Sequence, residues 1–236
     1  MKRIIITGAS SGIGRATAEY FLDHGWTVGL IARRAEALAE ISHDNAVHLP
    51  CDVTDEGAVD AAFARFGHLD VLFNNAGMFG PQGTIDTIAL ADWQAVVDVN
   101  LTGMFLCARA AFRQMRAQEP QGGRIINNGS ISAHSPREGS TSYTTTKHGV
   151  SGLTKTLTLD GRAYNIACGQ IDIGNARTDL VKGLEETRAA QGLDPLPSMA
   201  VADVARAVYG MATLPPEANV QSMMIMATKM PHIGRG

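Results

Sequence analysis

Short apolar runs and helical patterns alternate along the 236-residue chain. Runs of about four to eight apolar residues bounded by turn residues favour strands buried on both faces. The seven expected strands are Lys2–Ile6, Trp26–Ala32, Val47–Cys51, Asp70–Asn74, Arg124–Asn128, Tyr164–Cys168 and Ser222–Met226. Strands that alternate with helices form a parallel sheet with helices on both faces. The pattern therefore predicts a doubly wound α/β fold, with residues 1–236 in a single domain.

Helical spacing of apolar residues marks the connections between these strands. The expected helices are Ile13–Phe21, Val59–Phe66, Asp92–Met115, Tyr143–Leu159 and Val201–Leu214. Asn100 interrupts the apolar face of the third, where it either satisfies nearby backbone groups or holds a water near Lys147. Ala176–Met199 has no apolar period, so we expect either a mobile lid over a site or a plain surface excursion.

Composition narrows the function classes. The net charge is −3 and no basic stripe is present, so nucleic acid and anionic membranes are not expected as partners. The apolar run at the start is too short for a signal peptide, and no stretch approaches the roughly 18 apolar residues of a membrane span. Cys51, Cys107 and Cys168 are widely spaced, which favours reduced thiols in a cytoplasmic protein without a disulfide or metal site.

A glycine-rich loop follows the first strand. It contains Gly8, Ser10, Ser11, Gly12, Ile13 and Gly14, and a helix follows at once. Glycines let the backbone approach an anion, and a helix N-terminus presents free N–H groups at a positive dipole end. The spacing does not match a triphosphate loop. The sequence thus favours a dinucleotide phosphate site over a tight turn without a ligand.

The end of the second strand bears on the choice of cofactor. In dinucleotide folds an acid here favours a free ribose 2′-hydroxyl, whereas an arginine favours a 2′-phosphate. Residues 26–35 contain no acid, and Arg33 and Arg34 stand at the strand end. A guanidinium binds phosphate that a carboxylate would repel. We expect NADP rather than NAD; the alternative is that both arginines are solvated at a helix start.

Later strand ends carry further candidates for the cofactor site. After the third strand, Asp52 either accepts a bond from the adenine amino group or caps the next turn, beside Val53. Asn74, Ala76 and Gly77 at the fourth strand would let the chain pass close to a flat ligand, or form an ordinary turn. Gly169 and Ile171 are placed at the carboxyl end of the sixth strand, where ligands bind in open α/β sheets.

Ser130, Tyr143 and Lys147 carry the chemistry. Lys147 follows Tyr143 by four positions, so both lie on one helix face. A phenol has a pKa of about 10, but an ammonium about 4 Å away is worth about 4 kcal/mol at an effective dielectric near 20. That interaction would lower the phenol pKa toward the working pH of a general acid–base group. Ser130 could hold a substrate oxygen against the phenol. Alternatively, the helix merely contains the two residues by chance.

Together these residues resemble the classical short-chain dehydrogenase/reductase family. The resemblance spans nearly the whole chain and rests on Thr7–Gly14, Asn74–Gly77, Val99–Gly103, Ser130, and Tyr143 with Lys147. It implies a Rossmann-type fold that binds a nicotinamide dinucleotide in a homotetramer or homodimer. It makes Tyr143 the general acid or base, Ser130 the holder of the substrate oxygen, Lys147 the ligand of the nicotinamide ribose, and Asn100 the holder of a relay water.

Two departures from the family pattern stand out. The family's Pro-Gly after the sixth strand is Cys168-Gly169 here, and the threonine a few residues on is Ile173. In the family this segment touches the carboxamide and pyrophosphate of the cofactor. The C-terminus also ends in Met-Pro and a short tail, without the family's usual closing pattern.

The resulting hypothesis is an NADP(H)-dependent oxidoreductase that moves hydride between nicotinamide and a small-molecule carbonyl or secondary alcohol. The altered 168–173 segment supports a rival hypothesis, a regulator that senses NADP(H) and turns nothing over. The substrate itself is not readable, because the loops that would line its pocket vary independently of the scaffold.

Overall fold

The structure, a computed structural model, describes residues 1–178, 181, 192 and 194–232. Seven parallel strands form one sheet in the order β3-β2-β1-β4-β5-β6-β7. They are β1 (Arg3–Thr7), β2 (Thr27–Ala32), β3 (Ala46–Pro50), β4 (Val71–Asn74), β5 (Gly123–Asn128), β6 (Ile166–Ile173) and β7 (Ser222–Ile225). The predicted seven-stranded parallel sheet is confirmed.

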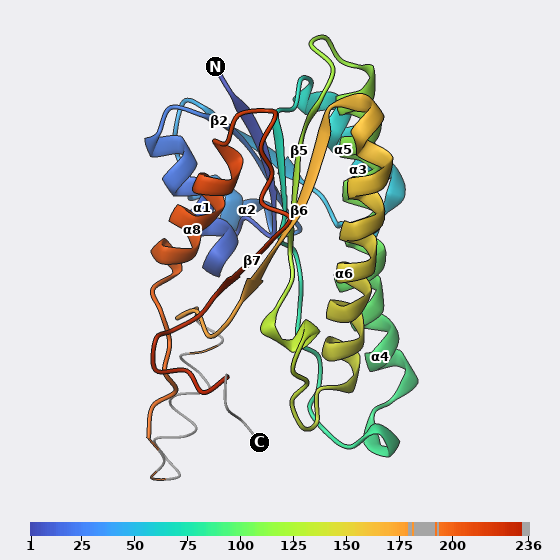
Figure 1. Cartoon of the computed structure of the whole chain (residues 1–236), viewed down its shortest axis with the longest axis vertical. Coiled ribbons are helices and arrows are strands. Elements are labelled where there is room, and N and C mark those ends of the chain that lie inside the picture. The colour runs from blue at the N-terminus through green and yellow to red at the C-terminus, as the bar shows by residue number, and fades with distance from the viewer. Residues whose placement is uncertain (179–180, 182–191, 193, 233–236) are drawn as a thin grey trace.

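Helices cover both faces of the sheet (Figure 1). One face packs against α1 (Gly12–Asp23), α2 (Ala35–Ala39) and α8 (Val201–Ala212). The other packs against α3 (Glu56–Phe66), α5 (Met104–Ala117) and α6 (Thr141–Gly161), with α4 (Leu90–Val97) preceding α5. Strand order reverses between β1 and β4, and such a reversal opens a crevice at the carboxyl ends of the strands.

Strand β6 is longer than the apolar run indicated. It pairs with β5 as far as Ile171 and with β7 as far as Ile173, so the expected end at Cys168 is wrong. Ile171 and Ile173 join the core beneath α1 and α8, while Gln170 and Asp172 alternate with them on the α6 side. The polar pair was mistaken for a loop because buried strands seldom contain a carboxylate.

The predicted helix over residues 92–115 is interrupted. α4 and α5 are joined by a π-helical turn, Asp98–Gly103, which contains Asn100. Single π turns often mark functional sites, because the extra residue displaces one side chain from the regular helix face. Among the described residues, Leu90–Ala117 as a whole is long and apolar enough to span a membrane, with a mean hydropathy of 1.4 in its best window. The expectation that no stretch is long and apolar enough for a membrane span is therefore wrong as regards length and composition. Half of that window is buried in the fold, as a core helix would be.

The segment expected to form a lid has its two ends side by side. The N–H of Arg177 donates to the carbonyl of Met199 (2.8 Å), and the N–H of Met199 donates to Asn175 (2.9 Å). Most of the segment between them, 179–180, 182–191 and 193, lies outside the described residues, as do residues 233–236 of the tail. The lid itself therefore stays a prediction.

Candidate active site

Hydrogen bonds join the carboxyl ends of β1, β4 and β5. The Thr7 hydroxyl accepts from the N–H groups of Asn75 (2.8 Å) and Ala76 (2.9 Å). The Asn75 side chain donates to the Thr7 carbonyl (2.9 Å) and accepts from Asn128 (2.8 Å). Asn74, in contrast, is 1% exposed and bonds to the Met104 carbonyl inside the fold. At this strand end Asn75, which was not among the predicted site residues, is the side chain that organises the crevice.

The glycine loop has the geometry that close approach to an anion requires. Gly8 and Gly12 adopt positive φ angles of 69° and 53°. A Cβ on Gly14 would lie 2.2 Å from the carbonyl oxygen of Gly8, so only glycine fits there. Helix α1 begins at Gly12 with no acidic residue in its first turn and no side-chain cap from Ser11. Its N–H groups are thus available to phosphate, and these residues fit a dinucleotide.

Arg33 and Arg34 are exposed at the end of β2. Arg34 reaches back to the Ser10 hydroxyl (3.4 Å), whereas the described residues offer Arg33 no carboxylate partner. Asp52 uses one carboxylate oxygen to hold the N–H and hydroxyl of Thr54, so it caps a local turn. Its other oxygen has no such bond, and Val53 beside it is buried against Gly103.

The extended β6 moves the nicotinamide end of the predicted site. Gly169 and Ile171 are buried within the sheet rather than exposed in a loop. A Cβ on Gly169 would lie 2.1 Å from the Val220 carbonyl, so this glycine is required by packing. The residues that follow the strand are Gly174 and Asn175, with Thr178 a few positions on. The Thr178 methyl group lies 3.1 Å from the position of a Cβ on Gly12, beside the glycine loop. The departure at Cys168–Ile173 therefore came from a misplaced strand end, since this segment lies within β6 and the residues that follow the strand are Gly174 and Asn175.

Tyr143 and Lys147 lie on one face of α6, as predicted. The Lys147 ammonium is 5.5 Å from the Tyr143 ring centroid and donates to the Asn128 carbonyl (2.7 Å). Lys147 is 3% exposed, and burial lowers its pKa to about 8, against the opposing effect of the Asp172 charge. The ammonium thus hydrogen-bonds to the backbone at the end of β5 and not to the phenol oxygen.

Ser130 reaches Tyr143 from the end of β5. It is 3% exposed, and its hydroxyl caps the short turn Ile131–Ala133 by accepting from the N–H of Ser132 (3.1 Å). Burial raises the pKa of Tyr143, while Ser130 and the charge of Arg137 lower it less strongly. In the protein alone, the direction is therefore opposite to the expected lowering, because desolvation of the phenolate outweighs Ser130 and Arg137.

Asn100 is wholly buried on the π turn. Its side chain accepts from the N–H of Met78 (2.8 Å) and donates to the carbonyl of the same residue (2.8 Å) and to Thr146 on α6 (3.3 Å). Of the two alternatives for Asn100, the backbone role is the one seen. It fixes the strand-end loop after β4 next to the turn of α6 that bears Lys147.

Phe79 completes the surroundings of the phenol. Its ring stacks on Tyr143 with centroids 4.3 Å apart and an interplanar angle of 20°. Phe79 is 39% exposed, so it forms an apolar wall beside the reactive hydroxyl. The structure thus brings Ser130, Tyr143, Lys147 and Asn100 together at the crevice, where a proton donor of this kind can act on an oxygen held by Ser130.

The family is decided by comparison. The model of the short chain dehydrogenase family matches residues 2–189. A 3beta-hydroxysteroid dehydrogenase from Mediterraneibacter gnavus is 35% identical over 212 residues, which cover 83% of this chain and 76% of that protein. The chain belongs to the short chain dehydrogenase family. It is therefore an oxidoreductase by family, of a kind that uses nicotinamide cofactors.

Solved structures of other short chain dehydrogenases agree with this fold. A serine dehydrogenase in its closed form, complexed with NADP⁺, superposes with a TM-score of 0.90 at 25% identity and covers 99% of this chain and 98% of its own. A 3-ketoacyl-(acyl-carrier-protein) reductase from Brucella melitensis, complexed with NADH, gives 0.85 at 24% identity and covers 95% and 96%. At its lower identity, the second likeness concerns the fold alone.

Besides Asn75, sequence reasoning missed Asp172 and its partner His134 in this short chain dehydrogenase. Asp172 on β6 is fully buried, and its carboxylate bonds to the His134 ring (2.8 Å) and to the N–H of Ser130 (2.9 Å). The alternation of polar and apolar residues in Gln170–Ile173 was the available signal, since a period of two is typical of a strand.

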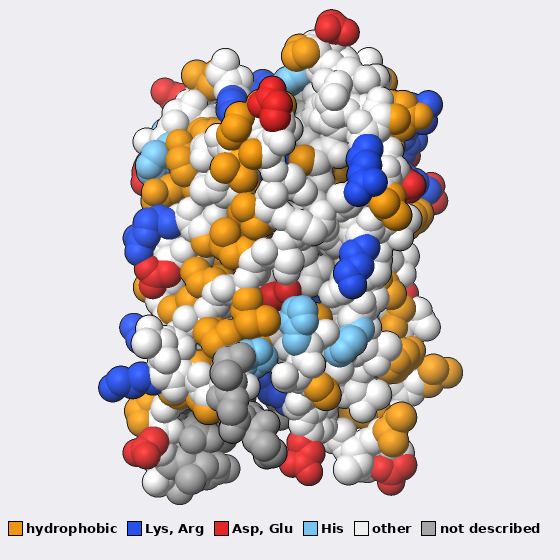
Figure 2. Space-filling model, in the orientation of Figure 1, with side chains coloured by type: hydrophobic (Ala, Val, Ile, Leu, Met, Phe, Trp, Pro, Cys, Tyr) orange, Lys and Arg blue, Asp and Glu red, His pale blue; other side chains and the backbone are white. Residues whose placement is uncertain are grey.

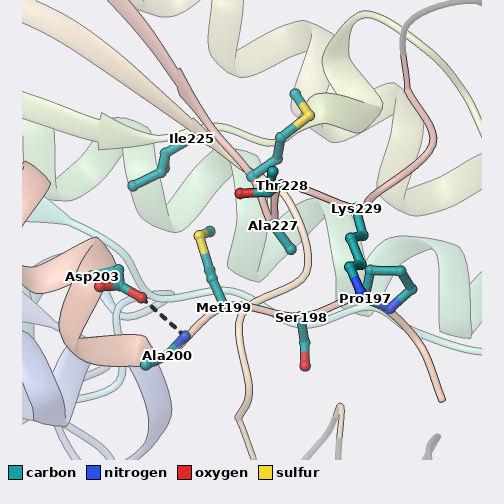
Figure 3. A pocket seen from close by; sticks show the side chains of 10 residues that line it. Pro197, Ser198, Met199, Ala200, Asp203, Ile225, Ala227, Thr228 and Lys229 are labelled. Atoms are coloured by element: carbon teal, nitrogen blue, oxygen red, sulfur yellow. Dashed lines mark hydrogen bonds between the residues drawn. The ribbon is translucent and has the colours of Figure 1, made fainter.

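A separate cavity of about 580 Å³ lies between the start of α8 and the segment after β7 (Figure 3). It is lined by Pro197–Ala200, Asp203 and residues 225–229, and Asp203 bonds to the N–H of Ala200 within it. None of the catalytic candidates lines it, so it is not the reaction site. No group of three His, Cys, Asp or Glu side chains suited to a metal occurs in the described part of the chain; the expected absence of a metal stays a prediction.

Proposed function

We propose that this chain is an NADP(H)-dependent oxidoreductase acting on a small-molecule carbonyl or secondary alcohol. The observation that carries the proposal is that the buried Ser130 adjoins Tyr143, whose ring centroid lies 5.5 Å from the ammonium of the buried Lys147 one helical turn on. A hydroxyl pair of this kind can hold one substrate oxygen and exchange its proton. A bound nicotinamide would supply the hydride chemistry.

Each side chain then has a defined task. Tyr143 gives its proton to the carbonyl oxygen during reduction and takes it back during alcohol oxidation. Ser130 holds the same oxygen, so its geometry is fixed before reaction. Lys147 places positive charge beneath the phenol and stabilises a phenolate when one forms. The raised pKa of free Tyr143 supports a protonated phenol at neutral pH, which suits reduction.

We expect NADPH oxidation with at least one member of a panel of ketones, quinones and β-keto esters. The measurement is the loss of NADPH absorbance after addition of each compound to the purified protein. NADPH binding without turnover on any member would favour the NADP(H)-sensing regulator. The regulator hypothesis rested on the altered segment 168–173. This segment is part of β6, so it no longer supports that hypothesis.

We propose NADP rather than NAD as the cofactor, because Arg33 is exposed and unpaired in the described residues, and its neighbour Arg34 reaches Ser10 of the glycine loop. Arg33→Asp should reverse the ratio of NADPH to NADH affinity, by about tenfold or more, since a carboxylate repels the 2′-phosphate and can bind the 2′-hydroxyl. Titration of protein fluorescence with each nucleotide measures the ratio.

The matched control for this substitution is Arg65→Asp, because Arg65 is an exposed residue in the last turn of α3, at the opposite end of the sheet from the crevice. The control makes the same charge change and should leave the ratio as it is. An unchanged ratio in Arg33→Asp would remove the argument for NADP.

We also propose that the protein is a cytoplasmic homodimer or homotetramer, without nucleic acid or membrane partners. Three buried free cysteines support a reducing compartment. Large apolar side chains exposed on α4, α5 and β7 support self-association: Leu90, Phe105 and Met224. Figure 2 shows apolar side chains gathered along the side of the molecule that carries α8 and the edge strand β7.

A further inference from the structure

Asp172 is the only fully buried carboxylate among the residues that the structure describes. It lies on β6 with its side chain toward α6, whereas Ile171 and Ile173 on either side point into the opposite core. A buried charge persists only when it is paired and hydrogen-bonded. The hydrogen-bond partners of Asp172 therefore indicate its role.

The carboxylate of Asp172 holds both ends of the turn that carries Ser130. One oxygen accepts from the N–H of Ser130 (2.9 Å) and from the Gln170 side chain (2.7 Å). The other bonds to Nε2 of His134 (2.8 Å), which follows the turn Ile131–Ala133. The position of the Ser130 hydroxyl thus depends on a carboxylate that would not itself touch the substrate.

Gly129 and Asp172 fit each other sterically. A Cβ on Gly129 would lie 2.1 Å from Oδ1 of Asp172 and 2.6 Å from the Gln170 amide nitrogen. The carboxylate therefore occupies the space that any side chain at position 129 would need. This close fit places the charge directly against the backbone that precedes Ser130.

The same charge acts on both catalytic candidates of α6, Tyr143 and Lys147. Lys147 is buried, and Asp172 is the one partner that counteracts the lowering of its pKa. Asp172 also contributes to the raised pKa of Tyr143, while Arg137 acts against it. His134 is the remaining titratable group in contact with the carboxylate. From the sheet, the β5 and β7 residues paired nearby, Asn128 and Met224, are uncharged.

We propose that Asp172 is a positioning residue of the active site, which fixes the Ser130 turn through His134 and the Ser130 amide and supplies the negative charge that faces Lys147. This role rests on the proposed oxidoreductase activity. A neutral residue of the same shape could hold the turn, but it could not act on Lys147 and Tyr143 through its charge. The two contributions can therefore be separated by experiment.

The first test is Asp172→Asn, which keeps the shape and removes the charge. Ultraviolet absorbance of the phenolate, titrated in the protein without cofactor and corrected with Tyr143→Phe, reports the Tyr143 midpoint. We expect this midpoint to fall by about one pH unit. Both limbs of the pH profile of kcat/KM should move to lower pH, with kcat reduced by about tenfold. Asp60→Asn, which removes a surface charge paired with Arg113, should change neither readout.

The second test guards against a variant that fails to fold. Gly129→Ala alone should lose most activity, because its methyl group displaces the carboxylate. Adding Asp172→Ala removes the closest clash and releases the Gln170 amide that the carboxylate holds, so this side chain can move away. The double variant should therefore recover a folded state while its Tyr143 midpoint stays low. A wild-type midpoint in both Asp172→Asn and the double variant would overturn the proposal. The phenolate titration needs no substrate, so it still decides if the wild-type protein turns over nothing on the panel, which would count against the proposed function alone.

Discussion

Replacing Tyr143 by phenylalanine is expected to lower turnover by about a thousandfold, within the range that general acid–base groups contribute. The substitution removes one hydroxyl and keeps the ring, so the stack on Phe79 and the packing of α6 are retained. NADPH affinity should stay within about twofold of wild type, since the remaining binding groups are unchanged. The measurements are steady-state turnover of an active panel compound and fluorescence titration with NADPH.

Tyr164→Phe is the matched control. Tyr164 lies just before β6, at the amino end of the sheet, where its ring packs against Phe112 and Arg116. Loss of its hydroxyl should leave turnover as it is. If Tyr143→Phe kept wild-type turnover, the proton would have to come from another group, and the assignment of the whole site would fail.

The family and the placement of its candidate residues on α6 and the glycine loop could be predicted from the sequence because they are set by local spacing. Tyr143 and Lys147 share a helix face whenever α6 forms, and the glycine loop follows directly from β1. The order of strand and helix patterns fixed the α/β class for the same reason. These features depend on neighbours in the chain, so no long-range contact had to be known.

The end of β6 could not be placed in this way. Gln170 and Asp172 are polar residues that a buried strand seldom contains. They can be buried here because they hydrogen-bond to Ser130, Ser151 and His134, which lie far away in the sequence. A carboxylate without partners is too costly to bury within a strand, whereas one with hydrogen-bond partners can be buried there. Polar and apolar residues do alternate in this stretch, as in a strand, but its polar residues favour a loop.

The ionisation of the site was also beyond the sequence. The spacing of Tyr143 and Lys147 indicates attraction between phenolate and ammonium, but the size of the opposing desolvation depends on what covers them. Lys147 is buried and held by the end of β5, and Tyr143 is covered on one side by the ring of Phe79. Burial therefore raises the pKa of one and lowers that of the other, and the strong coupling expected in the free protein is absent.

That buried cation leads to the second large effect, which is on stability as well as activity. Lys147→Met should lower turnover by about a hundredfold or more, because a phenolate then lacks its cation. The same change should raise the melting temperature at pH 7 by several degrees. The wild-type pKa is lowered from 10.5 to about 8, so at pH 7 folding carries the full cost of burying the ammonium, on the order of a few kcal/mol.

The pH dependence gives the sign of this effect. Below pH 8 the lysine is protonated in both the folded and unfolded states, and the cost is constant. Between about pH 8 and the unfolded value of 10.5, the unfolded state binds more protons, so wild-type stability gains relative to the methionine variant as pH rises. Thermal unfolding of both proteins at pH 7 and above pH 9 should therefore show the difference in melting temperature shrinking.

Lys155→Met is the matched control, since Lys155 is exposed two turns further along α6. It should change the melting temperature little at either pH, because an exposed lysine loses almost no hydration on folding. A Lys147→Met protein less stable than wild type at pH 7 would mean that the bond to Asn128 and the attraction of Asp172 exceed the cost of burial. In that case Lys147 would stabilise the folded site as well as supply its positive charge. The loss of turnover could then no longer be assigned to the missing cation alone.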